Sequence, residues 1–226
     1  PAAIATNPVA IHVGAVNMEA MGRAIRLLTP VLSAKRLETL RTSLFFMPPQ
    51  DTPVHGVEGE VRAVMQTPHG EIIVGGTGRN VYRDMDAAVI IDLGGDDDYV
   101  FSKPEENLGR NPVSLIIDYE GDDLYQTTGV GGPGACILGI GILLDLKGND
   151  RYCQGVSPVV DLRKQTRDTL VLADPEGVDT KLVPFVSVYG DAAKPDQPGA
   201  MLDSGFAFGA GFLGVGILYD GAGDAL

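Results

Sequence analysis

The chain has 226 residues, of which 44% are hydrophobic, and this share is enough to build a core and excludes global disorder. A net charge of −13 disfavours binding to nucleic-acid phosphates and to anionic membranes, and makes divalent cations the natural counterions. The 30 glycines, the absence of tryptophan and the 6% of aromatic residues favour many tight turns and thin strands over a helical bundle. No apolar run approaches the ~20 residues that span a bilayer, so membrane insertion is not expected.

Residues 17–46 are expected to form two helices, which belong to an N-terminal helical cap over residues 1–50. Asn17 is a candidate N-cap for the first helix, because its side chain can accept a hydrogen bond from a free backbone N–H. Residues 29–30, Thr-Pro, are expected to begin the second helix, since proline is favoured at the first helical position. We expect both helices to plug the open end of a β domain over residues 51–226.

One motif recurs through this β domain: two aliphatic residues are followed by D-x-x-G-[DN]-D-x-Y. Full copies occupy residues 90–99, 116–125 and 143–152, and partial copies occupy residues 73–82 and 218–226. Gly75 replaces the first aspartate in the partial copy that opens the series. Asp118 follows Asp92 by 26 residues and Asp145 follows Asp118 by 27, so the motif indicates a repeating structural unit.

A period of this length is typical of stacked units that bury their apolar faces on one another. The apolar runs are short, β-branched and followed by turn residues, so each unit is expected to hold strands. We predict a mainly β fold, a right-handed parallel β-solenoid with 26–27-residue coils, in which the aliphatic pairs point inward and Asp92, Asp118 and Asp145 lie in line. The corner glycines are expected at positive φ; they are Gly95, Gly121, Gly148 and Gly223.

The last spacing is longer, because Asp220 follows Asp145 by 75 residues, one 27-residue unit plus about 48. Residues 134–145 align without gaps on residues 209–220, so the repeat resumes after an insertion at about residues 156–203. Insertions in repeat proteins protrude from one face, which is often the binding face.

The insertion contains two segments in which apolar and polar residues alternate, residues 169–173 and 182–189. The sequence Asp-Pro-Glu-Gly at residues 174–177 lies between them and is typical of a turn. Together they predict an inserted β-hairpin.

The acidic residues of the motif are candidate calcium ligands. In stacked coils they would form rows of like charges about 5 Å apart, and Ca²⁺ would relieve the repulsion because it takes six to eight oxygen ligands. In the alternative, each aspartate accepts N–H bonds from its own corner in an Asx-type turn, and the replacements at Gly75 and Asn149 favour this alternative. The candidate metal ligands are Asp92, Asp96, Asp97, Asp118, Asp122, Asp123, Asp145, Asn149, Asp150, Asp220 and Asp224.

The tyrosines of the motif share one position and predict a row of stacked rings; they are Tyr82, Tyr99, Tyr125 and Tyr152. Such a row either binds sugars or packs the corner, and packing is favoured. Residues 129–134 match G-x-G-x-x-G, but the repeat and Pro133 explain these glycines better than a dinucleotide loop does. Calcium is therefore the candidate cofactor, and the catalytic residues, if the chain has any, are unknown from the sequence.

The motif resembles the D-x-G-G-D-D-x-Y corners of a group of bacterial repeat proteins, over about residues 70–226. It resembles more distantly the RTX-like calcium-binding repeats of haemolysin-type bacterial proteins, whose units have nine residues of the G-G-x-G-x-D type. The resemblance implies a bacterial, exported protein, which is secreted, periplasmic or held at the cell surface. It implies no catalytic residues.

We therefore expect an exported bacterial β-solenoid with a structural or binding role, stabilised by calcium, whose groove or inserted hairpin contacts a protein or glycan. The alternative is a carbohydrate-active enzyme of the parallel β-helix type, a polysaccharide lyase or glycoside hydrolase, with its site between the groove and the insertion. Such an enzyme should gather two or three acids with a lysine or arginine in one concave patch. The last copy stops at Leu226, one residue before its tyrosine, which predicts further chain that is itself a candidate partner.

Overall fold

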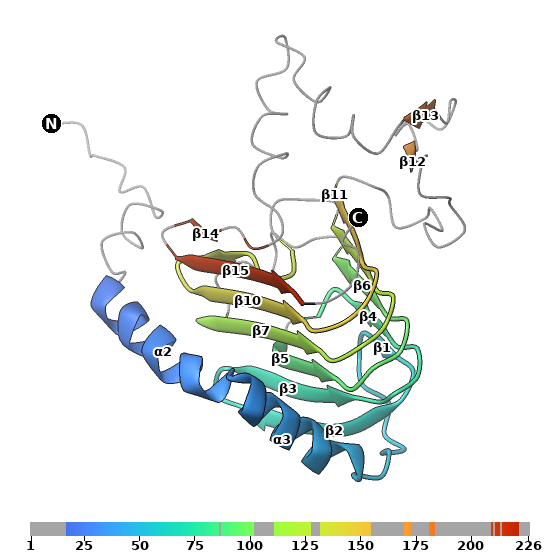
Figure 1. Ribbon diagram of the computed structural model, residues 1–226, viewed down its shortest axis with the longest axis horizontal. Coiled ribbons are helices and arrows are strands. Elements are labelled where there is room, and N and C mark those ends of the chain that lie inside the picture. Colours follow the sequence, from blue (N-terminus) through green and yellow to red (C-terminus); the bar gives the residue numbers. More distant parts are fainter. Residues whose placement is uncertain are drawn as a thin grey trace, which may run out of the picture.

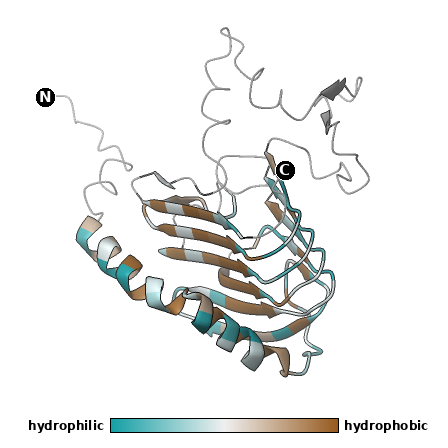
Figure 2. Cartoon of the chain, viewed as in Figure 1, coloured by the Kyte–Doolittle hydropathy of each residue, from teal (hydrophilic) through white to brown (hydrophobic). Residues whose placement is uncertain are grey.

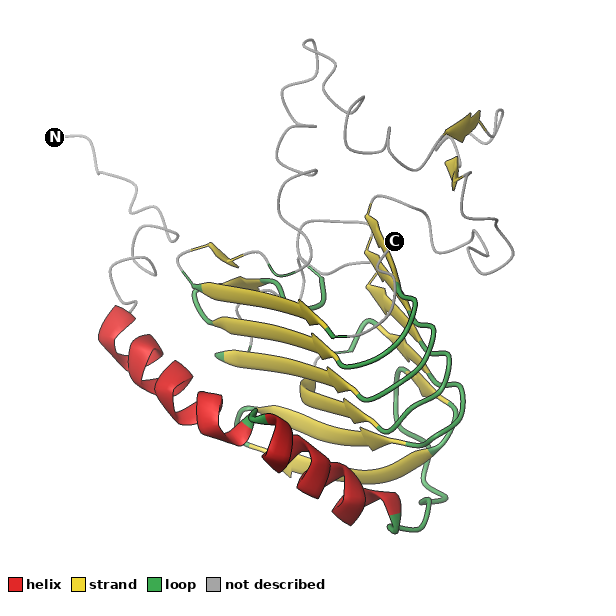
Figure 3. Ribbon diagram, in the orientation of Figure 1, coloured by secondary structure: helices red, strands yellow, loops and turns green. Residues whose placement is uncertain are grey.

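The computed structural model describes residues 17–85, 87–101, 111–127, 132–154, 170–172, 181–183, 209, 211–212 and 214–221. In this part of the chain two sheets face each other across a core, and two helices lie along the outer face of the larger sheet (Figure 1). Loops connect the two sheets at the corner where each copy of the motif turns (Figure 3).

The smaller sheet has five strands in the order β1-β4-β6-β8-β11, and the larger has six in the order β15-β10-β7-β5-β3-β2. The five are β1 (Val57–Glu58), β4 (Val81–Arg83), β6 (Asp98–Phe101), β8 (Leu124–Thr127) and β11 (Arg151–Gln154). The six are β15 (Val215–Asp220), β10 (Ile140–Asp145), β7 (Val113–Asp118), β5 (Ala87–Asp92), β3 (Gly70–Gly75) and β2 (Val61–Thr67). Pairing is parallel except at β1–β4 and β2–β3.

The predicted fold class is wrong. In its described residues the chain is an α/β fold with two helices and two large mixed sheets that are mostly parallel, and it is not a mainly β, right-handed parallel β-solenoid. Antiparallel strands begin both sheets, and the helices cover a sheet face where the prediction had them plug an open end. The placing of a domain boundary near residue 50 stays a prediction.

The aliphatic pair of each motif explains why helices are needed. The first residue of the pair packs between the sheets with the tyrosine rings, as Ile90, Ile116 and Leu143 do. The second lies on the opposite face of the same sheet, as Ile91, Ile117 and Leu144 do. Because the six-stranded sheet is therefore apolar on both faces (Figure 2), its outer face has to be covered, and the prediction that both residues point inward is wrong.

The two helices are α2 (Met18–Val31) and α3 (Ala34–Phe45). The Asn17 side chain accepts a hydrogen bond from the Ala20 N–H at 2.9 Å, so the predicted N-cap is confirmed. The predicted start of the second helix is wrong, because Pro30 lies in the last turn of α2 and Ser33 precedes α3. A proline near the end of a helix removes only one hydrogen bond, and the neighbouring turn continues.

Contacts from α3 hold it to the loop that follows β7. Leu37 is buried, and its carbonyl oxygen accepts a hydrogen bond of 2.7 Å from the Tyr119 hydroxyl. The Arg41 guanidinium lies over the Tyr119 ring and forms an ion pair of 2.5 Å with Glu120. These contacts fix the helix pair against the repeated strands.

The register of the strands confirms the alignment read from the motif. Asp118 pairs with Asp92 on one side and with Asp145 on the other, so the three residues lie in line as predicted. Across the insertion, Asp145 pairs with Asp220, and β9 (Cys136–Ile137) pairs with β14 (Gly211–Phe212) at the same offset of 75 residues. The repeat therefore resumes where the sequence predicts.

Most of the insertion at 156–203 lies outside the described residues. Within it, β12 (Leu170–Leu172) and β13 (Lys181–Val183) pair antiparallel, with Leu170 opposite Val183. The predicted hairpin is confirmed at this position, although its described strands are shorter than the predicted ones.

Corner glycines are needed for two different reasons. Gly95 has a φ of 133°, as predicted, whereas Gly121 and Gly148 do not have positive φ. A Cβ at Gly121 would overlap the Gly95 carbonyl, and one at Gly148 would overlap the Gly121 carbonyl. At these two positions the close approach of successive units excludes a side chain; Gly223 lies outside the described residues.

Candidate metal site

A column of aspartates runs along the corner between the two sheets. The first aspartate of each motif is the last residue of a strand in the six-stranded sheet, as Asp92 is for β5. The last aspartate of the motif stands just before a strand of the five-stranded sheet, as Asp97 does for β6. Six of these residues are buried; they are Asp92, Asp97, Asp118, Asp123, Asp145 and Asp150.

The first aspartate of each motif accepts a hydrogen bond from the tyrosine of the preceding motif. Tyr82 donates to Asp92, Tyr99 to Asp118 at 2.7 Å, Tyr125 to Asp145 at 2.8 Å and Tyr152 to Asp220 at 3.2 Å, each through Oδ2. Each bond joins one unit of the repeat to the next unit. The tyrosines and the aspartates therefore form one hydrogen-bonded ladder along the stack.

The rings of these tyrosines stack on one another, with 4.8–4.9 Å between centroids. Tyr82, Tyr99 and Tyr125 have no exposed surface. The favoured interpretation, corner packing, is confirmed for these three rings, and they do not form a sugar-binding surface.

The Asx-type turn, the alternative to metal binding, is present at two of the corners. Oδ1 of Asp92 accepts a hydrogen bond from the Gly94 N–H at 2.8 Å, and Oδ1 of Asp118 accepts one from the Glu120 N–H at 3.1 Å. At the third corner, Oδ1 of Asp145 is buried and accepts no hydrogen bond from the described residues. Turn capping therefore accounts for the first two aspartates and leaves the third unexplained.

The last aspartate of each motif is held from the preceding unit. Oδ1 of Asp97 accepts a bond from the Asn80 N–H, Oδ1 of Asp123 one from the Asp97 N–H, and Oδ1 of Asp150 one from the Asp123 N–H, at 2.5, 2.6 and 2.9 Å. The Oδ2 atoms of Asp123 and Asp150 are buried and accept no hydrogen bond from the described part of the chain. Backbone amides therefore hold one oxygen of each carboxylate.

The middle position of the G-[DN]-D step faces solvent and forms a separate row. Asp96, Asp122 and Asn149 are exposed, and the Asp122 N–H donates to Asp96 Oδ1 and the Asn149 N–H to Asp122 Oδ1, each at 3.0 Å. These bonds join successive units. The structure therefore does not bring this part of the predicted ligand set into the buried column.

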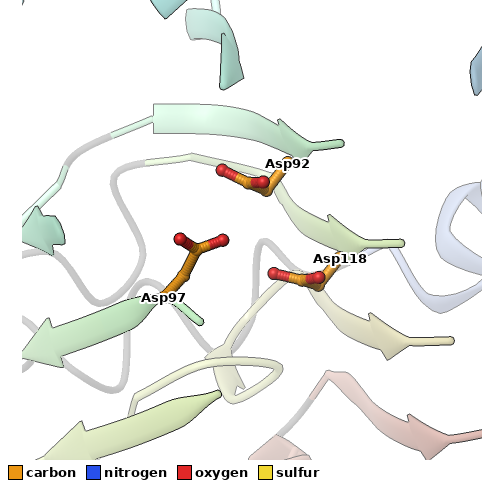
Figure 4. A group of neighbouring side chains, drawn as sticks. All are labelled: Asp92, Asp97 and Asp118. Atoms are coloured by element: carbon orange, nitrogen blue, oxygen red, sulfur yellow. The ribbon is translucent and has the colours of Figure 1, made fainter. Parts of the chain in front are cut away.

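The buried carboxylates form two groups in which one oxygen of each residue lies within 4.8 Å of the others. The first group comprises Asp92, Asp97 and Asp118, and the Asp97 side chain points across the corner toward the other two (Figure 4). The second comprises Asp123, Asp145 and Asp150. Neither group includes Asp220, and Asp224 lies outside the described residues.

Burial raises the pKa of five carboxyl groups in these two groups of aspartates. The pKa rises to about 9 for Asp123, to about 7 for Asp145 and to about 6 for Asp150, mainly by desolvation and also by repulsion from neighbouring aspartates. The pKa values of Asp92 and Asp118 are also well above the usual range, for the same causes. The column therefore needs protons or cations to balance its charge.

Sequence reasoning missed Asn80, which is fully buried at the start of the column. Its Nδ2 donates to the Glu60 carbonyl at 2.8 Å and to the Tyr82 hydroxyl at 2.9 Å. A signal was present, because Asn80 occupies the last-aspartate position of the partial motif at residues 73–82. The side-chain amide of Asn80 therefore supplies hydrogen-bond donors at this end of the column.

Comparison of the chain with protein-family models, with curated proteins and with solved structures gives no match. The resemblance to bacterial D-x-G-G-D-D-x-Y repeat proteins therefore stays a prediction. Neither described helix is long and apolar enough to cross a membrane. The patch expected of an enzyme, beside residues 156–203, lies mostly outside the described residues, so the enzyme alternative also stays a prediction.

Proposed function

We propose that this chain is a structural and binding scaffold of an exported bacterial protein, stabilised by calcium at its corner column. The observation that carries this proposal is the column of six buried aspartates, which recur at equivalent positions of the repeat. A repeat that only needed turn capping would be served by exposed residues or by asparagine, as Asn149 shows for the middle row.

The charge of the column supports a bound cation. Two carboxylates about 5 Å apart repel each other by about 3 kcal/mol at an effective dielectric constant of 20. Burying each charge adds a desolvation cost, which a hard divalent cation with oxygen ligands offsets. Calcium sites in extracellular modules have dissociation constants of about 10⁻⁴–10⁻³ M, and an affinity of this order would suit an exported protein.

The burial of the column favours a structural ion over a catalytic one. A catalytic metal keeps an open position for water or substrate, whereas Asp145 and Asp150 have no exposed surface. The tyrosine ladder also closes the inner side of the corner, because Tyr99 and Tyr125 are fully buried. These features support a role in holding the units together.

The partner that we propose is a protein that adds a strand of the same repeat type. Strand β15 pairs with β10 and has no second partner among the described strands. Its side chains Ile217, Leu218 and Tyr219 are 37%, 38% and 52% exposed, whereas their register partners in β10 are buried. A parallel strand with the same aliphatic pattern would continue the register and cover them.

Thermal unfolding with and without calcium tests the proposed stabilisation. We expect the melting temperature to rise with Ca²⁺ and to fall with a chelator, because an ion that binds only the folded state adds about 2.7 kcal/mol at 100-fold excess over Kd. Asp96→Asn is the matched control, since Asn149 occupies the same exposed row, and it should keep the full calcium response. An unchanged melting temperature in calcium and chelator would refute calcium stabilisation.

A further inference from the structure

We infer that the column binds one divalent cation per chain, that its ligands are Asp123, Asp145 and Asp150, and that the group Asp92, Asp97 and Asp118 binds none. This inference rests on the proposed function and names the position and the number of the ions. The first group contains two first aspartates and one last aspartate of the motif, whereas the second contains one first aspartate and two last aspartates.

In each carboxylate of the second group, one oxygen accepts a hydrogen bond and the other oxygen is available as a metal ligand. Tyr125 donates to Oδ2 of Asp145, while the Asp97 and Asp123 N–H groups donate to Oδ1 of Asp123 and of Asp150. The opposite oxygens, Asp145 Oδ1, Asp123 Oδ2 and Asp150 Oδ2, are buried and accept no hydrogen bond from the described residues. Hydrogen bonds that orient one oxygen of a ligand are typical of the shell around a metal site.

The spacing of the three carboxylates suits a single ion between them. One oxygen from each of the three residues lies within 4.8 Å of the others. Ca²⁺ binds oxygen at 2.3–2.6 Å, so two ligands on opposite sides of one ion are separated by about 4.6–5.2 Å at most. Three carboxylates that face one ion would leave a charge of about −1 in place of −3, which removes most of their mutual repulsion.

The first group differs because two of its three carboxylates already have a donor at each oxygen. Asp92 accepts bonds from Gly94 and Tyr82, one at each oxygen, and Asp118 accepts bonds from Glu120 and Tyr99 in the same way. A carboxylate with both oxygens occupied would have to give up a hydrogen bond to bind a cation. The geometry therefore selects the second group.

The loss of one turn contact at Asp145 adds to this difference. At the first two corners the residue two positions after the aspartate donates its N–H to Oδ1, whereas Oδ1 of Asp145 is left without a donor. Asp145 lies in β10, which pairs with β7 on one side and with the edge strand β15 on the other. The third corner is thus the one at which a cation replaces a missing hydrogen bond.

Equilibrium dialysis of the whole chain against calcium chloride counts the ions. We expect one Ca²⁺ per chain, and we expect Asp145→Asn and Asp150→Asn to weaken its binding by more than about tenfold, because each removes a charged ligand. Asp92→Asn is the matched control within the first group and should bind calcium as the unchanged protein does. Far-ultraviolet circular dichroism checks that each variant is folded.

A second measurement needs no variant. Crystals of the unchanged protein soaked in terbium, which occupies calcium sites, should show one anomalous density peak between Asp123, Asp145 and Asp150. A peak at the first group, two peaks, or loss of calcium in Asp92→Asn would overturn this inference and leave calcium stabilisation standing. No bound ion in either experiment would overturn both the inference and the proposed stabilisation.

Discussion

At the scale of single residues, the same aspartate side chain has three different surroundings in this chain. Asp122 is exposed, Asp118 is buried with a donor at each oxygen, and Asp145 is buried with one oxygen that lacks a donor. Their chemistry follows from burial and from hydrogen-bond donors, because the side chain itself is identical.

The raised pKa values predict how stability depends on pH when calcium is removed. The pKa values of Asp123, Asp145 and Asp150 in the folded chain, about 9, 7 and 6, exceed the value of about 3.9 in an unfolded chain. The folded state therefore keeps protons that the unfolded state releases. This contribution to stability is complete below about pH 4 and is lost as the pH rises through 6 to 9.

We expect the melting temperature in chelator to fall between pH 5 and pH 9, as measured by circular dichroism. Asp123→Asn should flatten this dependence, because the asparagine stays neutral throughout the range. Asp96→Asn, in the exposed row, should leave it unchanged. A melting temperature in chelator that rises over this range would show that these three carboxyl groups are ionised in the folded protein.

The tyrosine ladder gives a second prediction at this scale. Tyr125→Phe removes the donor to Oδ2 of Asp145 and leaves the stacked ring in place. We expect a loss of about 1–3 kcal/mol in the free energy of unfolding, because a buried acceptor loses its partner. Tyr219→Phe is the control, since Tyr219 is 52% exposed, and urea unfolding should show a change within about 0.5 kcal/mol. Equal losses in both variants would contradict the role of this hydrogen bond.

At the scale of elements, the strands β5, β7 and β10 of the six-stranded sheet are apolar on both faces, so both faces have to be covered. Ile116 packs toward the tyrosines and Ile117 packs beneath the helices. A parallel strand buried on both faces reads as a continuous apolar run, as these motifs do. The helices are therefore part of the core and are not an appendage.

The close contact between successive units predicts different results for two equivalent glycines. A Cβ at Gly121 would overlap the Gly95 carbonyl, whereas a Cβ at Gly78, the same position of the first partial motif, meets nothing within 4 Å. We expect Gly121→Ala to lose about 1–3 kcal/mol through overpacking and Gly78→Ala to change stability by less than about 0.5 kcal/mol. Urea unfolding measures both, and equal effects would mean that the units are not in close contact.

At the scale of the whole molecule, the stack of parallel strands has a different strand at each end. The antiparallel strand β2 lies at one end of the larger sheet, and β15 lies at the other. The exposed apolar side chains of β15 are the type of edge that pairs with another strand.

This edge predicts binding of a strand of the same repeat type. A labelled peptide with the sequence of residues 209–220 should bind the chain, as measured by fluorescence anisotropy, and Leu218→Lys should weaken binding because it places a charge on the edge. Met65→Lys on β2, where Met65 is 55% exposed, is the matched control at the opposite end. Equal binding to both variants would locate the contact elsewhere.

The sequence by itself determined the repeat and its register. The alignment of Asp92, Asp118, Asp145 and Asp220, and the stacking of the tyrosines, follow from one motif repeated at nearly constant spacing. Side chains alternate between the faces of a strand, so a slip of one residue would turn every apolar residue to the wrong face. The position of the insertion follows for the same reason.

The tertiary structure alone decided the fold class and the difference between the two acidic groups. Helix α3 covers the sheet because its Leu37 and Arg41 meet side chains far along the chain, and no local pattern records that contact. Oδ1 of Asp118 accepts a hydrogen bond from the Glu120 N–H, whereas Oδ1 of Asp145 accepts none from the described residues, although both aspartates occupy the same position of the motif. A motif specifies which residues recur, whereas packing between distant segments specifies which of their atoms find a partner.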